Sequence, residues 1–169
     1  MADTILTLNA GSSSIKFGVY DRRAGRDPAL RLSGQVEAIG LGARLIVKDR
    51  NARDLAGVDT HAAALETILD LIEAEPGLGA VAMIGHRIVH GGPDHAAPAA
   101  LTPATMAYLE TLAPFAPLHQ PHNLAGVRAA EAAFPGVPQI GCFDTAFHRN
   151  HPWVNDTFAL PRRFYDKGV

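Results

Sequence analysis

The hydrophobic pattern of this chain changes its period near residue 60, and this change restricts the possible folds more than any other feature of the sequence. Before residue 60, apolar residues alternate with polar ones or form short runs bounded by turn residues, which is typical of strands. Four segments are predicted as strands, the last one short: Thr4–Ala10, Ile15–Tyr20, Ala29–Ala38 and Leu45–Lys48. From residue 60 onward, apolar residues recur at helical spacing and predict a helix from about Thr60 to Glu75.

Strands and helices then alternate along the rest of the pattern. The predicted elements are a buried strand from Val81 to Val89, a helix from Thr102 to Ala113, a helix from Asn123 to Phe134 and a strand from Val137 to Phe143. The stretch between these two helices is expected to be irregular because it contains three prolines, Pro114, Pro117 and Pro121. A hairpin followed by strand–helix–strand units predicts an α/β fold, a mixed sheet with helices on its faces.

Composition narrows the function classes. The 169 residues are 47% hydrophobic and 19% charged, which is typical of a globular chain with one main core. The net charge of −2 and the lack of a Lys/Arg cluster argue against a nucleic-acid partner, and no apolar run approaches the ~20 residues that span a bilayer. A single cysteine fits a reducing compartment, and Asp3 stands where a signal peptide would be basic. We expect a cytoplasmic protein with no membrane contact.

Polar residues follow three of the predicted strands. In α/β sheets, ligands bind beyond the carboxyl ends of the parallel strands. The first strand leads into Asn9–Ser14 and then Lys16, the middle strand into His86–Gly92, and the last into Asp144–His148. The loop 116–121 is expected beside them. An amide with hydroxyls, a guanidinium and a carboxylate would therefore meet at one edge of the sheet.

Each of these motifs allows two interpretations. Gly11-Ser12-Ser13-Ser14 fits a plain hairpin turn or a phosphate cradle built from backbone N–H groups and hydroxyls; it lacks the Gly-Lys-Ser/Thr of a P-loop and the Gly-x-Ser-x-Gly of a nucleophile elbow. Lys16 could be a plain surface residue. Arg87 fits a structural ion pair or a small-anion site. Asp144 fits a turn cap or a Mg²⁺ ligand.

Two other kinds of site are weakly supported. Two histidine pairs have the spacing H-x-x-H, His119/His122 and His148/His151. Neither pair falls within a predicted helix, and neither has cysteine partners, so a zinc site is not expected. Cys142 lies in an apolar run and is expected to be a buried strand residue rather than a nucleophile. A hydrolase that uses Ser12 or Ser14 with a histidine has no supporting spacing beyond coincidence.

Four motifs taken together resemble the acetate kinase family, a member of the actin-like, sugar-kinase superfamily. They are Asn9-Ala-Gly-Ser-Ser-Ser-Ile-Lys16, His86-Arg-Ile-Val-His-Gly-Gly92, Ala116-Pro-Leu-His119 and Phe143-Asp-Thr-Ala-Phe-His148. They occur in the family's order over nearly the whole chain. The resemblance implies that residues 1–169 are the N-terminal ribonuclease-H-like domain, a five-stranded mixed sheet with helices on both faces. It also implies reversible transfer of the ATP γ-phosphoryl group to acetate.

The resemblance assigns catalytic roles to three residues. Arg87 matches the arginine that holds the acetate carboxylate and the transferring phosphoryl group, a task that suits a permanently charged bidentate donor. Asp144 matches the catalytic aspartate; because acetate is already ionised at pH 7, we interpret it as holding Mg²⁺ (or Mn²⁺) rather than abstracting a proton. Asn9 matches the residue near the metal and the phosphate. His119 matches the histidine that donates to the transition-state phosphoryl oxygens.

The resemblance also assigns binding roles to residues around them. Ser12, Ser14 and Lys16 match the phosphate-side loop. Val89 and Leu118 match an apolar pocket for the acetate methyl, and because such a pocket discriminates by only ~1–3 kcal/mol per methylene, propionate is a second expected acceptor.

The chain departs from the family at two places and in length. His151-Pro152 stands where Met-Pro is common. Gln120 stands where many relatives carry Asn. The family continues beyond Val169 with a nucleotide-binding lobe that this chain does not contain, so the isolated chain is expected to be inactive and the full-length enzyme to be a homodimer. The alternative is a truncated, non-catalytic domain that binds an anion or a partner chain.

Overall fold

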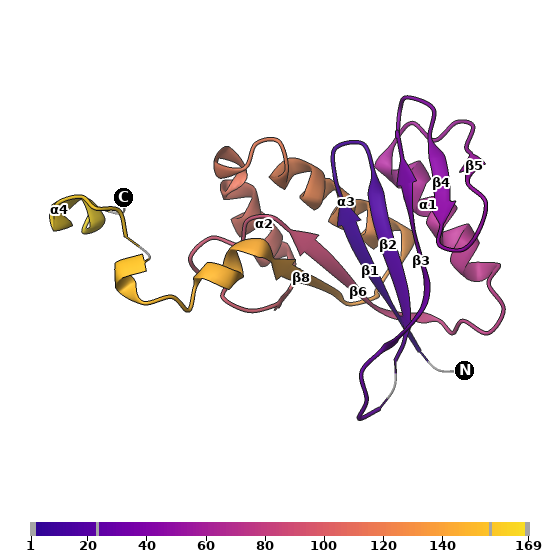
Figure 1. Cartoon of the computed structure of the whole chain (residues 1–169), viewed down its shortest axis with the longest axis horizontal. Helices are drawn as coiled ribbons and strands as arrows, with labels where there is room; N and C mark the ends of the chain where they lie inside the picture. Colours follow the sequence, from indigo (N-terminus) through magenta and orange to yellow (C-terminus); the bar gives the residue numbers. More distant parts are fainter. Residues whose placement is uncertain (1–2, 23, 156, 168–169) are drawn as a thin grey trace.

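The computed structural model describes residues 3–22, 24–155 and 157–167. It is an α/β domain built on one mixed sheet (Figure 1). The strands are β1 Thr4–Ala10, β2 Ile15–Asp21, β3 Ala29–Glu37, β4 Arg44–Val47, β5 Arg53–Asp54, β6 Val81–Ile88, β7 Ala99–Ala100 and β8 Gln139–Phe143. The helices are α1 His61–Glu73, α2 Pro103–Thr111, α3 Gln120–Ala133 and α4 Arg162–Tyr165, with the 3-10 turns η1 Ala113–Phe115, η2 Asp144–His148 and η3 Trp153–Asn155.

The strand order places the candidate site strands side by side. The sheet runs β5-β4-β3-β2-β1-β6-β8-β7. β1 pairs antiparallel with β2 and parallel with β6, and β6 pairs parallel with β8. The carboxyl ends of β1, β6 and β8 therefore meet at one edge, as the order of elements predicts.

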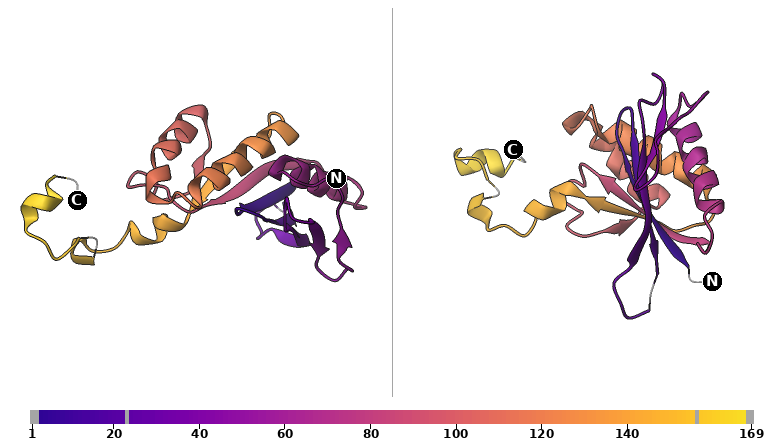
Figure 2. Two further views of the ribbon diagram at one scale, coloured as in Figure 1. Left: turned by 90° about the horizontal axis from the view of Figure 1, so that it is seen from above. Right: turned by 45° about the vertical axis from the view of Figure 1, so that its right-hand side comes forward.

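Helices α1, α2 and α3 pack against one face of this sheet (Figure 2). The larger core joins the inward side chains of β1 to β4 with α1, for example Leu6 with Leu65 and Ile68. A smaller cluster joins Ile88 and Phe143 with α2 and α3. The prediction of helices on both faces is thus wrong for the described residues. Alternation of polar and apolar residues along a strand shows that one face of the sheet is buried, but it does not show whether helices also cover the other face.

The alternation of side chains across the strands decides which residues face solvent. In β1, Leu6, Leu8 and Ala10 are buried against the helices, while Thr7 and Asn9 point the other way. In β8, Gly141 and Phe143 are buried, and Cys142 is exposed on the uncovered face. The prediction of a buried Cys142 is therefore wrong, since its two neighbours take the inward positions.

The sheet has eight strands instead of the expected five. The short strand near Leu45 is confirmed as β4, whereas β5 and β7 are two-residue pairings. Helix α3 begins at Gln120, three residues before the predicted start. After β8 the chain runs away from the sheet through η2, η3 and α4 (Figure 1), and it carries exposed apolar side chains such as Trp153 and Phe158. None of the described helices is long and apolar enough to cross a membrane.

Candidate active site at the carboxyl edge of the sheet

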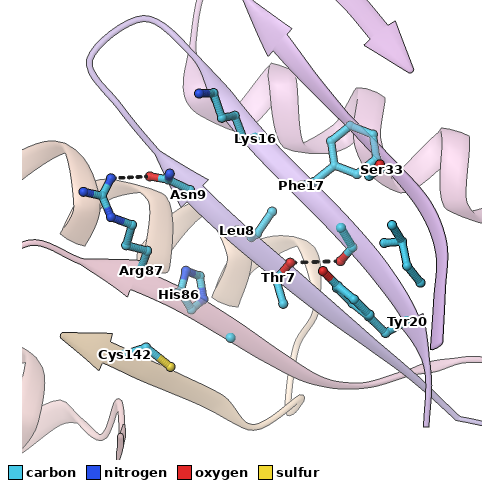
Figure 3. A pocket seen from close by; sticks show the side chains of 13 residues that line it. Thr7, Leu8, Asn9, Lys16, Phe17, Tyr20, Ser33, His86, Arg87 and Cys142 are labelled. Carbon is cyan, nitrogen blue, oxygen red and sulfur yellow. Dashed lines mark hydrogen bonds between the residues drawn. The ribbon is translucent and has the colours of Figure 1, made fainter. Parts of the chain in front are cut away.

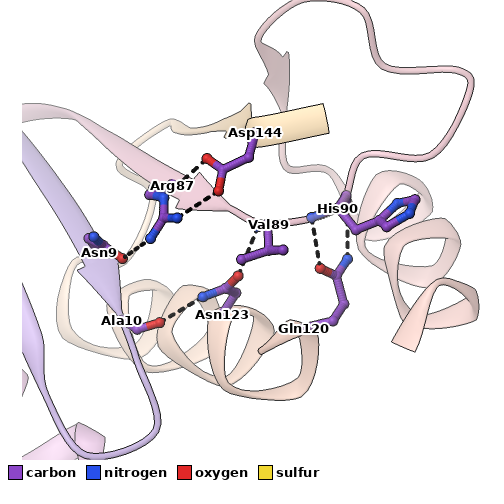
Figure 4. Close-up of polar contacts among 8 residues, drawn as sticks. All are labelled: Asn9, Ala10, Arg87, Val89, His90, Gln120, Asn123 and Asp144. Carbon is purple, nitrogen blue, oxygen red and sulfur yellow. Dashed lines mark hydrogen bonds and ion pairs between the residues drawn. The ribbon is translucent and has the colours of Figure 1, made fainter. Parts of the chain in front are cut away.

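Arg87 joins the ends of three strands (Figure 4). Its Nε donates to Asp144 Oδ1 at 3.1 Å and its Nη2 to Asp144 Oδ2 at 2.7 Å. Its Nη1 donates to Asn9 Oδ1 at 3.3 Å. The amide, guanidinium and carboxylate that the sequence places after β1, in β6 and after β8 are thus in direct contact.

Strand register explains this meeting. Leu8 lies opposite His86 across the parallel β1–β6 ladder, so the next residues, Asn9 and Arg87, emerge side by side on the uncovered face. Arg87 lies opposite Cys142, and Asp144, two residues beyond Cys142, returns to the same face. A one-residue slip of β1 or β8 would turn Asn9 or Asp144 toward the helices.

The ion pair is solvated and contributes little to stability. The Arg87 and Asp144 side chains are 52% and 41% exposed, and exposed pairs contribute about 0–1 kcal/mol. Among the described contacts, Asp144 takes two of the five guanidinium N–H donors and Asn9 takes a third, so two remain for an additional anion. The arrangement is thus better suited to binding than to holding the fold.

A hollow of about 410 Å³ opens on the uncovered face beside these residues (Figure 3). The surface is hollowed here because two residues without side chains, Gly18 on β2 and Gly85 on β6, lie directly opposite Thr7 of β1. Lys16, which lies opposite Asn9 on β2, adds a second cation at the rim.

His86 lies under the same hollow and is a different kind of group. It is 3% exposed and contacts the Gln139 amide at 2.6 Å. Burial lowers the pKa of His86 from 6.5 to about 4, so this imidazole is neutral at physiological pH. It therefore adds no positive charge to the site.

The turn from β1 to β2 places Ser12 and Ser14 at the same edge. The Gly11 N–H donates to the Ser14 carbonyl at 2.8 Å, and the Gly11 carbonyl accepts from His61 Nε2 at 2.6 Å. Ser12 is exposed and Ser14 half-buried. The geometry is a hairpin turn whose hydroxyls are available, so both sequence interpretations of this motif are compatible with it.

The remaining predicted site residues lie on the loop before α3 and after β6. His119 is exposed at the N-cap of α3, Leu118 is 75% exposed in the turn before it, and Val89 is half-buried at the end of β6. Within the described part of the chain, the lining of the hollow includes neither Val89 nor Leu118. Their apolar pocket remains a prediction.

Two buried amides on α3 were not predicted. Gln120 and Asn123 are fully buried or nearly so and hydrogen-bond the backbone at the ends of β1 and β6. The sequence does hold a signal for them, since polar residues three apart precede the apolar Leu124 and Val127 on one helical stripe. The signal was missed because the helix was expected to start at Asn123.

Comparison with known proteins identifies the family of this chain. The model of the Acetokinase family matches residues 4–169. This chain belongs to the acetokinase family. An acetate kinase of Methylocella silvestris is 43% identical over the whole chain, which covers 45% of that relative. The chain thus spans less than half the length of the curated relatives it matches.

Solved structures of the family share the fold. An acetate kinase from Porphyromonas gingivalis superposes with a TM-score of 0.83 at 35% identity, covering 99% of this chain and 44% of that one. A propionate kinase from Francisella tularensis gives 0.85 at 27% identity, covering 98% and 43%. The expected actin-like α/β class is therefore confirmed.

Proposed function

We propose that this chain supplies the acetate and phosphoryl side of an acetate kinase, which transfers the ATP γ-phosphoryl group reversibly to acetate. The observation that carries the proposal is Arg87 held between Asn9 and Asp144 at the carboxyl edge of the sheet. Membership of the acetokinase family supports it. ATP and acetate are the proposed co-substrates.

In the proposed mechanism Arg87 binds the anions. Its two remaining donors would bind the acetate carboxylate or a phosphoryl oxygen, and its fixed charge would offset the charge of two anions brought together. Lys16, Ser12 and Ser14 would bind phosphate oxygens from the neighbouring strand and turn. Acetate attacks as its ionised carboxylate, so Asp144 abstracts no proton.

The residues present fit a divalent cation in part. Asp144 offers a carboxylate and Asn9 an amide oxygen, which are ligand types that Mg²⁺ accepts. Two protein ligands suit an ion that is completed by water and substrate phosphates, whereas the described residues contain no cluster of three or more His, Cys, Asp or Glu for an all-protein site. Such a cation, Mg²⁺ or Mn²⁺, would neutralise charge on the phosphates. Arg87 donates to the Asn9 amide oxygen and to the Asp144 carboxylate, so it would compete with the cation for these ligands.

We further propose that His119 donates to the phosphoryl oxygens and that Val89 and Leu118 border the acetate methyl. Leu118 is exposed, so an apolar pocket at this place would need closure of the loop before α3. The likeness to a propionate kinase favours propionate as a second acceptor.

The nucleotide-binding lobe and the homodimer are proposed for a longer enzyme of the family's length, which would work in the cytoplasm. The alternative function is a non-catalytic domain that binds an anion or a partner chain. Both proposed functions expect apolar side chains on a surface that a second lobe or a partner chain covers. The exposed apolar side chains after β8 agree with this expectation.

A hydroxamate assay of the purified 169-residue chain with acetate and MgATP tests the completeness of the site. We expect no turnover, and binding of acetyl phosphate that Arg87→Ala removes. Full turnover would contradict the need for a second lobe. If acetyl phosphate binding is unaffected by Arg87→Ala, the proposed anion site is wrong.

A further inference from the structure

One buried amide connects the two strand ends that carry the site. The Val89 N–H donates to Asn123 Oδ1 at 3.0 Å, and Asn123 Nδ2 donates to the Ala10 carbonyl at 2.6 Å (Figure 4). Ala10 follows Asn9 at the end of β1, and Val89 lies two residues beyond Arg87. Both partners are backbone groups with fixed donor and acceptor roles, so the orientation of the Asn123 amide is unambiguous.

The packing of α3 makes this bridge possible. Gly126 lies one helical turn beyond Asn123, and a Cβ on it would stand 2.6 Å from the Ala10 Cβ. The helix backbone therefore approaches the end of β1 more closely than any residue with a side chain would allow. At that distance the short Asn123 side chain reaches both strands, and it is only 6% exposed.

From this geometry we propose that Asn123 is a positioning residue, which fixes the spacing between the phosphate-side turn after β1 and the Arg87-bearing end of β6. The proposal rests on the proposed function. Asn123 itself touches neither substrate nor the reacting atoms; it acts through Asn9 and Arg87. Asn123 thereby adds a buried side-chain contact that holds the two halves of the anion site together beyond the last paired residues of the β1–β6 ladder.

The orientation of the turn follows from two bonds to successive carbonyls, those of Ala10 and Gly11. The peptide is planar and trans, so a carbonyl and the following N–H point in opposite directions. Asn123 holds the Ala10 carbonyl, and His61 holds the next one, that of Gly11. The Ser12 N–H therefore points away from His61.

A neighbouring amide performs a parallel task on the other strand. Gln120 Nε2 donates to the His90 carbonyl at 2.9 Å, and the His90 N–H donates to Gln120 Oε1 at 3.2 Å. Gln120 also donates to the Leu109 carbonyl of α2 at 3.2 Å. It fixes the loop after β6 to α2 and α3 but has no described bond to β1, so of the two α3 amides Asn123 is the one that bonds both strand ends.

Asn123→Asp tests the coupling in the 169-residue chain. The carboxylate keeps the acceptor for Val89 but replaces the donor to Ala10 with a repelling oxygen. Gly126→Ala is a second variant, which keeps the amide and pushes α3 away from Ala10. Ile68→Val, in the α1 core, serves as a control for lost stability without contact to the site.

The first readout is the Kd for acetyl phosphate, measured by titration calorimetry in the wild type, in Arg87→Ala and in the double variants. We expect Asn123→Asp and Gly126→Ala to weaken binding by about tenfold and to have no further effect once Arg87 is replaced. Unchanged affinity in both variants, or an equal loss in Ile68→Val, would overturn the proposal.

The second readout does not depend on ligand. The Arg87 Nε–H signal in ¹⁵N spectra reports its bond to Asp144, which lies on the far side of β6 from Ala10. We expect this signal to shift or broaden in both α3 variants and to stay unchanged in Ile68→Val. If the wild type binds no acetyl phosphate, the proposed function fails for this chain, and this signal alone decides: its constancy in both variants refutes the positioning role.

Discussion

Acidification is expected to destabilise this domain through one residue, His86. The side chain is 3% exposed on β6, and burial lowers its pKa from 6.5 to about 4. The folded state therefore favours the neutral imidazole. Between these two pKa values the unfolded chain binds one more proton than the folded chain, so stability is fully present above pH 6.5 and falls as the pH drops toward 4.

The surroundings of His86 explain why the charged form is excluded. One orientation of the Gln139 amide gives a hydrogen-bond partner to each polar group around it. In this orientation its nitrogen donates to His86 Nε2 at 2.6 Å and to the Val127 carbonyl at 3.3 Å, and its oxygen accepts from the Glu131 N–H. In this orientation Nε2 must be an acceptor, and a protonated imidazole has none.

The magnitude follows from the shift. Lowering the pKa from 6.5 to about 4 corresponds to about 3 kcal/mol at full effect, and about 2 kcal/mol of it is lost at pH 5. A domain with ~5–15 kcal/mol of stability would lose a large share. Because the side chain is nearly inaccessible, solvent screening reduces this value little.

Urea unfolding followed by circular dichroism at pH 7.5 and pH 5 measures the effect. The His86→Gln variant removes the titrating group and keeps an amide partner for Gln139. We expect the free-energy difference between wild type and variant to change by about 2 kcal/mol between the two pH values. His151→Gln, at an exposed position, is the matched control and should show no such change. An identical pH dependence in wild type and His86→Gln would refute the reasoning.

Three further changes have expected outcomes. Arg87→Lys should leave the free energy of unfolding in urea within about 0.5 kcal/mol of wild type, because the ion pair is exposed. Its affinity for acetyl phosphate, measured by calorimetry, should fall because bidentate donation is lost; an unchanged affinity would contradict the role of the guanidinium fork. Gly34→Ala should lower the free energy of unfolding in urea by about 1–3 kcal/mol. The new Cβ would overlap the Ile46 carbonyl and lie 2.9 Å from Phe17. If the variant is as stable as wild type, β3 and β4 shift freely. Thr60→Ala should lower the free energy of unfolding by about 1 kcal/mol in the same assay. It removes the N-cap hydrogen bond of α1, which the Ala63 N–H donates to Thr60 Oγ1 at 3.1 Å. No loss of stability would mean that water replaces this hydrogen bond.

The central strands could be predicted because each carries a pattern long enough to be distinctive. The predicted strand Thr4–Ala10 has the same bounds as β1 in the structure. β5 and β7 contain two residues each, which is too short for any alternation to appear. They exist because neighbouring strands offer unpaired backbone groups, and this cause lies in the tertiary structure rather than in their own residues.

The candidate site could be predicted as far as strand ends determine it. Asn9, Arg87 and Asp144 meet because the sheet order brings their strands together, and a sequence reading needs only the strand boundaries to anticipate this. Leu118 lies in a loop, where no periodicity fixes the direction of a side chain, and it is 75% exposed. Its pairing with Val89 in one pocket is therefore still a prediction.

The start of α3 shows how a local rule can hide part of a site. Pro121 predicts a break in the helix, yet proline is tolerated in the first turn, where its missing N–H has no helical partner anyway. The structure places it there, directly after Gln120. Because the helix begins earlier, Gln120 and Asn123 fall on the stripe that faces the sheet.

This stripe ties the core to the site energetically. Leu124 and Val127 are 2% exposed and belong to the smaller core cluster, and burial of such side chains contributes about 1.5–3 kcal/mol each. The same helix face presents Asn123 to two backbone groups that would otherwise be buried without partners, at about 1–3 kcal/mol each. Apolar packing thus fixes the helix, and the helix fixes the strand ends. The solvated Arg87–Asp144 pair contributes little to folding, so its position must be imposed by these buried contacts beneath it.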